Sequence, residues 1–227
     1  MIDGTGAVLF DFNGVIVDDE EQHRLACQDV LAESGIPLTR EQYYAHYLGC
    51  DDFACFVAAF QRAGKALTPA ATERLIAEKS RRYERLIDAS LVLVPGAKAF
   101  VERAAEELRL GLVSGALRHE IDHVLHRVGL RDCFEVVVAA EDVDACKPNP
   151  AGYLAARAAL DRRAPISARQ CVVVEDSLPG LAAARAAGMR CAMLSTSHDP
   201  ALLSEADAVW PSFQGHEPAE LVSLLTT

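Results

Sequence analysis

Acidic, hydroxyl and basic side chains stand at four points along the chain, and each point closes or closely follows a short apolar run. These residues are Asp11 and Asn13, Ser114 and Gly115, Lys147, and Glu175 and Asp176. A single carboxylate after a strand is more often a helix cap or a turn residue. Acidic residues at two of these points, together with a serine hydroxyl at a third and a lysine at the fourth, are harder to explain as caps and turns. We therefore treat these residues as a candidate functional site.

The chemistry that such a set suits is phosphoryl transfer. A carboxylate such as Asp11 can attack phosphorus and carry the phosphoryl group between two easier steps. Mg²⁺ prefers oxygen ligands with few protein carboxylates, which Asp11 and Asp176 can supply. The Ser114 hydroxyl and the Lys147 ammonium can hold phosphate oxygens as charge moves. Gly115 lets the backbone approach the anion closely.

The elements that must position these side chains are predicted to be strands of a parallel sheet. From residue 91 onward, strand-sized apolar runs alternate with amphipathic helices, a pattern typical of α/β proteins with right-handed crossovers. Ligands of such sheets bind beyond the carboxyl ends of the strands, which is where the candidate residues fall. We expect a doubly wound, Rossmann-like α/β core with strands at 7–10, 111–114, 136–139, 171–175, 191–194 and 208–210, and with helices near 97–107, 118–128, 150–160 and 179–187.

A helical segment interrupts this pattern soon after the first strand. Glycine and proline residues divide it into four expected helices, over residues 20–34, 40–48, 51–63 and 69–87. We therefore expect two domains. Residues 1–17 and 91–227 form the Rossmann-like catalytic core, and residues 18–90 form an inserted four-helix cap.

Composition narrows the classes of function. Lys and Arg total 22 against 33 Asp and Glu, a net charge of −11, which disfavours nonspecific nucleic-acid binding. No apolar run approaches the roughly 20 residues that a membrane helix needs, and residues 1–4 lack signal-peptide character. Seven scattered cysteines without C-x-x-C spacing argue against a disulfide framework and a zinc site. We expect a soluble, cytoplasmic protein with no nucleic-acid or membrane partner.

Four segments resemble, in this order, the motifs of the haloacid dehalogenase superfamily: Asp11-Phe12-Asn13-Gly14-Val15, Ser114-Gly115, Lys147-Pro148 and Glu175-Asp176-Ser177-x-x-Gly180. The helical insert resembles the α-helical cap of the β-phosphoglucomutase-like and phosphoglycolate phosphatase-like branch. The resemblance implies a Mg²⁺-dependent phosphatase that acts on a small phosphorylated metabolite through an aspartyl phosphate. It makes Asp11 the nucleophile and has Ser114 and Lys147 bind the phosphoryl group. The implied Mg²⁺ ligands are Asp11, Asp176 with Glu175, and the backbone carbonyl of Asn13.

Asn13 departs from the family pattern, which usually has a second aspartate at this position to exchange a proton with the leaving group and with water. An amide cannot do so, and a positioned general acid–base is typically worth about 10²–10⁴-fold in rate. Three alternatives stay open. Another group after the nucleophile takes over the proton, or the substrate has a good leaving group, or the protein binds a phosphorylated ligand with little turnover. The first alternative involves Asp18, Asp19, Glu20 or His23, and His23 is also a candidate substrate-binding residue.

Two related activities are weighed against hydrolysis. A phosphomutase needs a basic group in the cap loop near Gly49, and this loop reads Gly49-Cys50-Asp51-Asp52, whose acids would repel phosphate. A phosphonate hydrolase needs a cap lysine for a Schiff base, and the expected cap contains Lys65 and Lys79. Both activities stay as alternatives. The sequence is compatible with a monomer or a homodimer.

Overall fold

The computed structural model describes residues 6–48 and 50–225, so the expectations for residues 1–4 and for Gly49 lie outside the described part. Contacts divide the chain into two compact units. The core unit comprises the described residues up to Asp18 together with those from Val92 onward. The helical unit comprises Asp19–Leu91.

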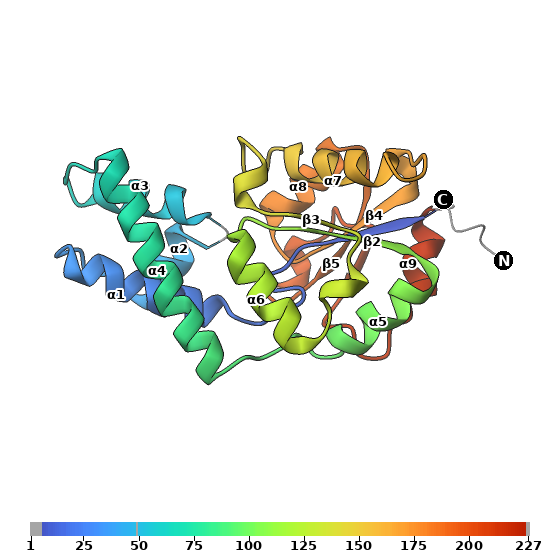
Figure 1. Cartoon of the computed structure of the whole chain (residues 1–227), viewed down its shortest axis with the longest axis horizontal. Helices are drawn as coiled ribbons and strands as arrows, with labels where there is room; N and C mark the ends of the chain where they lie inside the picture. The colour runs from blue at the N-terminus through green and yellow to red at the C-terminus, as the bar shows by residue number, and fades with distance from the viewer. Residues whose placement is uncertain (1–5, 49, 226–227) are drawn as a thin grey trace. The chain divides into compact units, whose positions relative to one another are not determined.

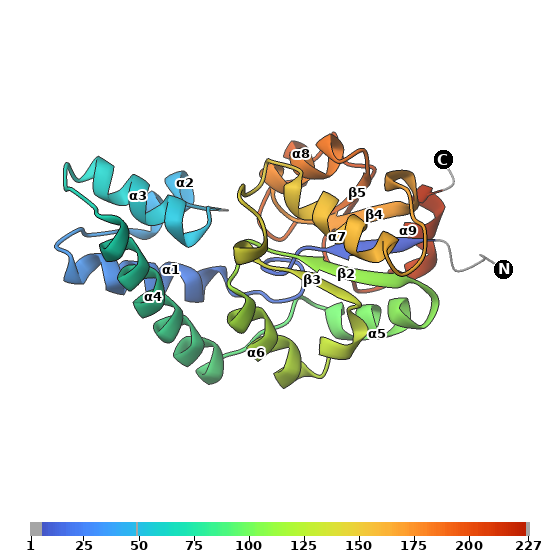
Figure 2. The same ribbon diagram turned by 45° about the horizontal axis from the view of Figure 1, so that its top comes forward.

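The core unit contains a six-stranded parallel sheet in the order β3-β2-β1-β4-β5-β6 (Figures 1 and 2). The chain winds outward from β1 to β3, returns to place β4 beside β1, and winds outward again to β6. The predicted doubly wound fold is therefore confirmed, and its topological switch point lies between β1 and β4, where such folds bind ligands. The strands are β1 (Ala7–Phe10), β2 (Arg109–Val113), β3 (Val136–Val138), β4 (Cys171–Glu175), β5 (Arg190–Leu194) and β6 (Ala208–Trp210).

Helices cover both faces of this sheet, as Figure 2 shows: α7 and α8 lie on one face, and α5, α6 and α9 lie on the other. Strands β1 and β4 are buried along their whole length, which explains why they are apolar without alternation. On the α5 side, the Phe10 ring contacts Phe100, Phe134 and Phe213 at centroid distances of 6.4, 6.0 and 6.3 Å. The helices are α5 (Ala97–Glu107), α6 (Arg118–Val128), α7 (Ala151–Asp161), α8 (Leu178–Ala186) and α9 (Pro218–Leu225).

The helical unit contains α1 (Glu20–Glu33), α2 (Arg40–His46), α3 (Asp52–Arg62) and α4 (Pro69–Ala89). Thr39, Asp51 and Thr68 cap the last three of these helices, because each side chain accepts a backbone N–H from the first turn. Tyr43, Tyr47, Phe56 and Phe60 are buried in the unit's own apolar core. None of the helices in residues 6–48 and 50–225 is long and apolar enough to cross a membrane.

Candidate active site

The candidate residues gather at the carboxyl ends of neighbouring strands. Asp11 directly follows β1, Ser114 directly follows β2, and Glu175 is the last residue of β4. The ladder continues for one residue beyond β1, because the backbone N–H of Asp11 donates to the Val174 carbonyl at 2.9 Å. Lys147 lies on the connection between β3 and α7. The sheet order thus brings together side chains that are far apart in the sequence.

Lys147 joins two carboxylates that come from adjacent strands. Its Nζ lies 2.5 Å from Asp11 Oδ1 and 2.5 Å from Glu175 Oε1, and it also donates to the Val113 carbonyl at 3.4 Å. The Glu175 side chain is fully buried, and the Asp11 and Lys147 side chains are mostly buried. Because hydrogen bonds between ionised groups are stronger than neutral ones, Lys147 fixes the relative positions of the β1 and β4 strand ends.

Burial and neighbouring charges shift the pKa values of these groups in different directions. Burial raises the pKa of Asp11 to about 7, although the Lys147 ammonium opposes this shift. Burial and the Glu175 and Asp11 charges raise the pKa of Asp176. Burial also disfavours the charged form of Glu175, but the Lys147 contacts outweigh it and hold the pKa of Glu175 below its ordinary value. Burial likewise disfavours charged Lys147, yet the carboxylates of Asp11 and Glu175 raise its pKa overall.

Hydrogen-bond donors surround both oxygens of Glu175. Oε1 accepts from Lys147 and from the Tyr153 hydroxyl at 2.8 Å. Oε2 accepts from the backbone N–H groups of Asp176 and Ser177 at 3.0 and 2.9 Å, and from the Ser177 hydroxyl at 2.9 Å. These donors stabilise the ionised carboxylate. In this arrangement Glu175 anchors Lys147 and the start of α8, and its role as a direct metal ligand stays a prediction.

Gly180 in α8 makes room for the Glu175 carboxylate. A Cβ atom at position 180 would lie 1.9 Å from the Glu175 carboxyl carbon. No real Cβ atom approaches a neighbour so closely, so any larger residue would displace this carboxylate from the site. The glycine in the Glu175-Asp176-Ser177-x-x-Gly180 segment therefore has a steric reason.

The residues present fit a divalent cation. One carboxylate oxygen from each of Asp11, Glu175 and Asp176 lies within 4.8 Å of the other two. If all three carboxylates are ionised, as metal ligands are, the lysine ammonium leaves two negative charges uncompensated in this buried site, and one Mg²⁺ would balance them. Hard oxygen donors suit this ion. Burial is the largest cause of the raised pKa values of Asp11 and Asp176, and the charge of the neighbouring carboxylates adds to it.

Ser114 and Asn13 lie side by side. The Ser114 hydroxyl donates to Asn13 Oδ1 at 3.3 Å and accepts from the Ala116 backbone N–H at 3.0 Å. A Cβ atom at Gly115 would meet no described atom within 4 Å. The backbone at Gly115 therefore faces open space, and crowding by the protein does not require glycine there.

His23 lies on α1 in the helical unit, within a charged cluster of that unit. Its Nδ1 is 2.7 Å from Lys79 Nζ, and its Nε2 is 3.4 Å from Asp19 Oδ2. Lys79 also pairs with Asp52 at 3.0 Å. The Tyr83 hydroxyl donates to Asp19, and the Tyr83 ring stacks on His23 with a centroid distance of 4.2 Å. A lysine ammonium at Nδ1 can only donate, so this arrangement makes Nδ1 the acceptor and places the imidazole proton on Nε2.

The other groups considered for proton transfer have different surroundings. Glu20 is mostly buried and accepts from the Tyr43 hydroxyl at 2.6 Å, and burial raises the pKa of Glu20. Asp18 is exposed, and its backbone N–H donates to the Val92 carbonyl at 2.9 Å. Lys65, weighed above as a Schiff-base lysine, donates to the Ser34 carbonyl at 2.5 Å, which suits a helix-capping role.

Comparison with known protein families is in line with this geometry. The model of the family described as haloacid dehalogenase-like hydrolase matches residues 5–188. This chain belongs to that family. The expected family and the expected enzyme class, a hydrolase, are therefore confirmed.

This hydrolase is similar to named phosphatases and to solved structures. It is 32% identical over 187 residues to hexitol phosphatase B of Escherichia coli (strain K12), a match that covers 81% of each chain. It is 30% identical over 206 residues to validoxylamine A 7'-phosphate phosphatase of Streptomyces hygroscopicus subsp. limoneus, covering 88% of this chain and 91% of that one. Its fold resembles the crystal structure of CbbY from Rhodobacter sphaeroides in complex with phosphate, with a TM-score of 0.84 and 27% identity over 96% of this chain and 99% of that one. Another structure of CbbY contains xylulose-(1,5)bisphosphate.

The structure of the hydrolase adds residues that the sequence did not single out. Tyr153 on α7 donates to Glu175, and Thr196 and Ser197, after β5, contact the loops that follow β1 and β4. The rule that chemistry follows strand ends, applied to β5, would have found Thr196 and Ser197. Tyr153 could have been recognised as a candidate residue because its hydroxyl interrupts an otherwise apolar helix face.

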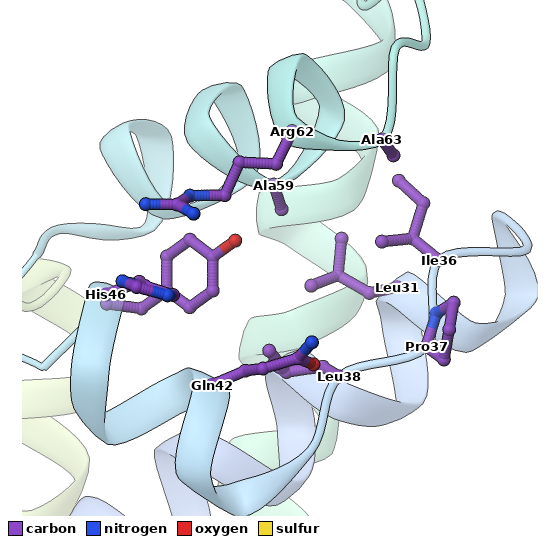
Figure 3. Close-up of a pocket in the computed structure, with 10 residues that line it drawn as sticks. Leu31, Ile36, Pro37, Leu38, Gln42, His46, Ala59, Arg62 and Ala63 are labelled. Atoms are coloured by element: carbon purple, nitrogen blue, oxygen red, sulfur yellow. The ribbon is translucent and has the colours of Figure 1, made fainter.

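A separate cavity of about 270 Å³ lies within the helical unit (Figure 3). Leu31, Ile36, Leu38 and Ala59 form its apolar part, and Arg62 lies at its other side with His46. Its lining contains none of the candidate residues.

Proposed function

We propose that this hydrolase is a Mg²⁺-dependent phosphatase that acts on small phosphorylated metabolites through an aspartyl phosphate on Asp11. One observation carries the proposal. A buried carboxylate at the end of β1 contacts a lysine at 2.5 Å and shares an acidic cluster with Asp176 at the end of β4. The phosphatase names of relatives with at least 30% identity support it.

In the proposed first step, an Asp11 carboxylate oxygen attacks phosphorus, and the bond from phosphorus to the substrate oxygen breaks with its electron pair on that oxygen. The leaving oxygen takes up a proton and departs as an alcohol. Water then attacks the phosphorus of the aspartyl phosphate, loses a proton, and releases inorganic phosphate and free Asp11. Splitting the reaction in this way replaces one difficult step by two easier ones.

The chain's own residues have separate tasks in this proposal. Lys147 and the Ser114 hydroxyl bind oxygens of the phosphoryl group, and the open backbone at Gly115 offers its N–H to the same group. Asp11, Asp176 and the backbone carbonyl of Asn13 would hold the Mg²⁺, with Glu175 beside them. When bound, Mg²⁺ neutralises the carboxylates and the phosphoryl oxygens, so that two negatively charged groups can approach each other.

The group that protonates the leaving oxygen is the open part of the mechanism, because Asn13 stands where the family usually has an aspartate. Its amide accepts from Ser114 and cannot exchange a proton near neutral pH. Asp19 and Glu20 already accept hydrogen bonds from tyrosine hydroxyls, whereas His23 bears an exchangeable proton. We propose His23 as the proton-transfer and substrate-binding group. A phosphate-ligand binder with little turnover is the second candidate function, and the observation in its favour is Asn13 itself.

Three further parts of the proposal concern the whole molecule. Helices α1–α4 would serve as the cap that sets substrate specificity. All seven cysteines are free thiols, which supports a reducing, cytoplasmic location. The protein would act as a monomer or a homodimer on its small substrate.

The test is release of inorganic phosphate from an aryl phosphate and from a panel of hexitol, sugar and sugar bisphosphate esters, with Mg²⁺ and with EDTA. The proposal expects Mg²⁺-dependent release that disappears in Asp11→Asn. Asp132→Asn is the matched control, since it makes the same change at an exposed aspartate of the core unit. Phosphate release that survives Asp11→Asn contradicts the proposed nucleophile. Mg²⁺ binding without any release favours the second candidate function.

A further inference from the structure

The loop that follows β5 bonds to both of the loops that carry the proposed metal ligands. The Thr196 hydroxyl donates to the Gly14 carbonyl at 2.7 Å, in the loop after β1. The adjacent Ser197 hydroxyl donates to Oδ2 of Asp176, in the loop after β4. Strand β5 is a neighbour of β4 but not of β1. The loop therefore reaches across β4 to hold the loop of the central strand.

Gly14 and Asp176 are in close contact beneath these two hydroxyls. Gly14 has a φ of 72°, a backbone conformation that residues with a side chain rarely adopt. A Cβ atom at Gly14 would lie 2.1 Å from Asp176 Oδ2. Oδ2 of Asp176, the oxygen that accepts from Ser197, therefore lies against the Gly14 backbone.

This arrangement leaves the two oxygens of Asp176 with different surroundings. Oδ2 accepts from Ser197 and faces Gly14, whereas no side chain or backbone group of the described residues donates to Oδ1. The Asp176 side chain is buried among Asp11 and Glu175 in the acidic cluster. Oδ1 is therefore the oxygen that stays available to a cation.

We propose that Thr196 and Ser197 are positioning residues for the metal site. Ser197 turns Asp176 so that it offers Oδ1 alone to Mg²⁺. Thr196 holds the Gly14 segment, and with it the adjacent Asn13 carbonyl that the proposed function makes a ligand. The inference rests on the proposed Mg²⁺ site. Hydrogen bonds that orient metal ligands are typically worth about 10- to 100-fold in metal affinity.

The experiment measures the Mg²⁺ dissociation constant of the full chain by isothermal titration calorimetry, without substrate. Ser197→Ala is expected to weaken Mg²⁺ binding by about 10- to 100-fold, and Ser197→Thr, which keeps the hydroxyl, is expected to restore most of it. Thr196→Val, which preserves the side-chain shape, is expected to weaken binding by a smaller factor. Ser195→Ala is the matched control, because Ser195 lies on the same loop and its hydroxyl donates to the Trp210 carbonyl at 3.5 Å. Among the described residues, this hydroxyl makes no hydrogen bond to either metal-site loop.

The outcomes separate this inference from the proposed function. Wild-type binding with a loss confined to Ser197→Ala and Thr196→Val supports the inference. Wild-type binding that Ser197→Ala leaves within twofold overturns it, while the metal site itself stands. Equal losses in Ser197→Ala and Ser195→Ala also overturn it, since the effect would then belong to the loop and not to the contact. A wild-type protein that binds no Mg²⁺ contradicts both proposals. Urea unfolding in EDTA verifies that each variant is folded.

Discussion

Replacing Lys147 by methionine removes the cation between two buried carboxylates. The Lys147 side chain is only 18% exposed, and its Nζ lies 2.5 Å from both Asp11 and Glu175. Methionine fills a similar volume but carries no charge, so both carboxylates lose their main compensation. Breaking a buried ion pair by removing one partner typically costs about 3–5 kcal/mol. We expect this loss of unfolding free energy in metal-free protein at pH 8.

Two conditions should reduce the loss in the Lys147→Met variant. At pH 5.5, Asp11 binds a proton more readily and one buried negative charge disappears. At pH 8, Mg²⁺ at about 100 times its dissociation constant should raise the unfolding free energy of the variant by about 2.7 kcal/mol over that of the same variant in EDTA, because Mg²⁺ binds to the folded state alone. Activity should not return, because the lysine also binds the phosphoryl group in our proposal.

The assay is urea denaturation followed by circular dichroism, with EDTA or with Mg²⁺, at both pH values. Lys98→Met is the matched control, since Lys98 is half exposed and lies 3.8 Å from Glu102. An exposed pair of this kind is worth about 0–1 kcal/mol. Our account of Lys147 is refuted if Lys147→Met unfolds at the same urea concentration as wild type in EDTA at pH 8.

Three other predictions follow from the site. In metal-free wild type, the unfolding free energy should fall as the pH rises from 5.5 to 8, because burial raises the pKa of Asp11 to about 7 and the folded state then binds more protons than the unfolded state in this range. Denaturation at several pH values measures this, and the slope should shrink in Asp11→Asn. Gly180→Ala should cost about 1–3 kcal/mol and most of the turnover, because the new Cβ displaces Glu175. Gly115→Ala is the matched control for Gly180→Ala, because its Cβ would meet no described atom within 4 Å, and it should leave the unfolding free energy in urea unchanged. Asn13→Asp tests the role proposed for His23: kcat for phosphate release should stay nearly unchanged if His23 already transfers the proton, whereas an increase of at least tenfold would show that Asn13 limits the rate and would contradict that role.

The sequence predicted the strands that carry the site because their signal is local. The runs at β1 and β4 are apolar without alternation, as strands buried on both faces must be, and the observed bounds Ala7–Phe10 and Cys171–Glu175 match the expected ones. Strand β2 begins two residues earlier than expected, at Arg109. Its charge obscured the pattern, because the Arg109 side chain reaches Glu135 and the Leu160 carbonyl at the end of α7.

The contacts between distant segments were not predictable in the same way. Nothing near Glu175 in the sequence indicates that Tyr153 will donate to it. The position of Ser197 after β5 could have made it a candidate, but nothing in the sequence indicates that its partner is Asp176. These pairs depend on the order of strands in the sheet and on where each loop crosses it. The helix α2 also ends at His46, two residues before the expected end, because Tyr47 is its C-cap and the Leu48 N–H bonds back to the Tyr43 carbonyl, which already accepts the last helical bond from Tyr47.

The central position of β1 has a consequence for how the chain acquires its fold during synthesis. Ala7 pairs with Arg109 on one side and with Cys171 on the other, so β1 is synthesised about 100 and 160 positions before its two partner strands. The whole helical unit, Asp19–Leu91, is made in between. Contacts of such long sequence separation form late and slowly. We expect nascent chains that end before Arg109 to show protease protection within α1–α4 but not at β1, and equal protection of both segments would contradict this order.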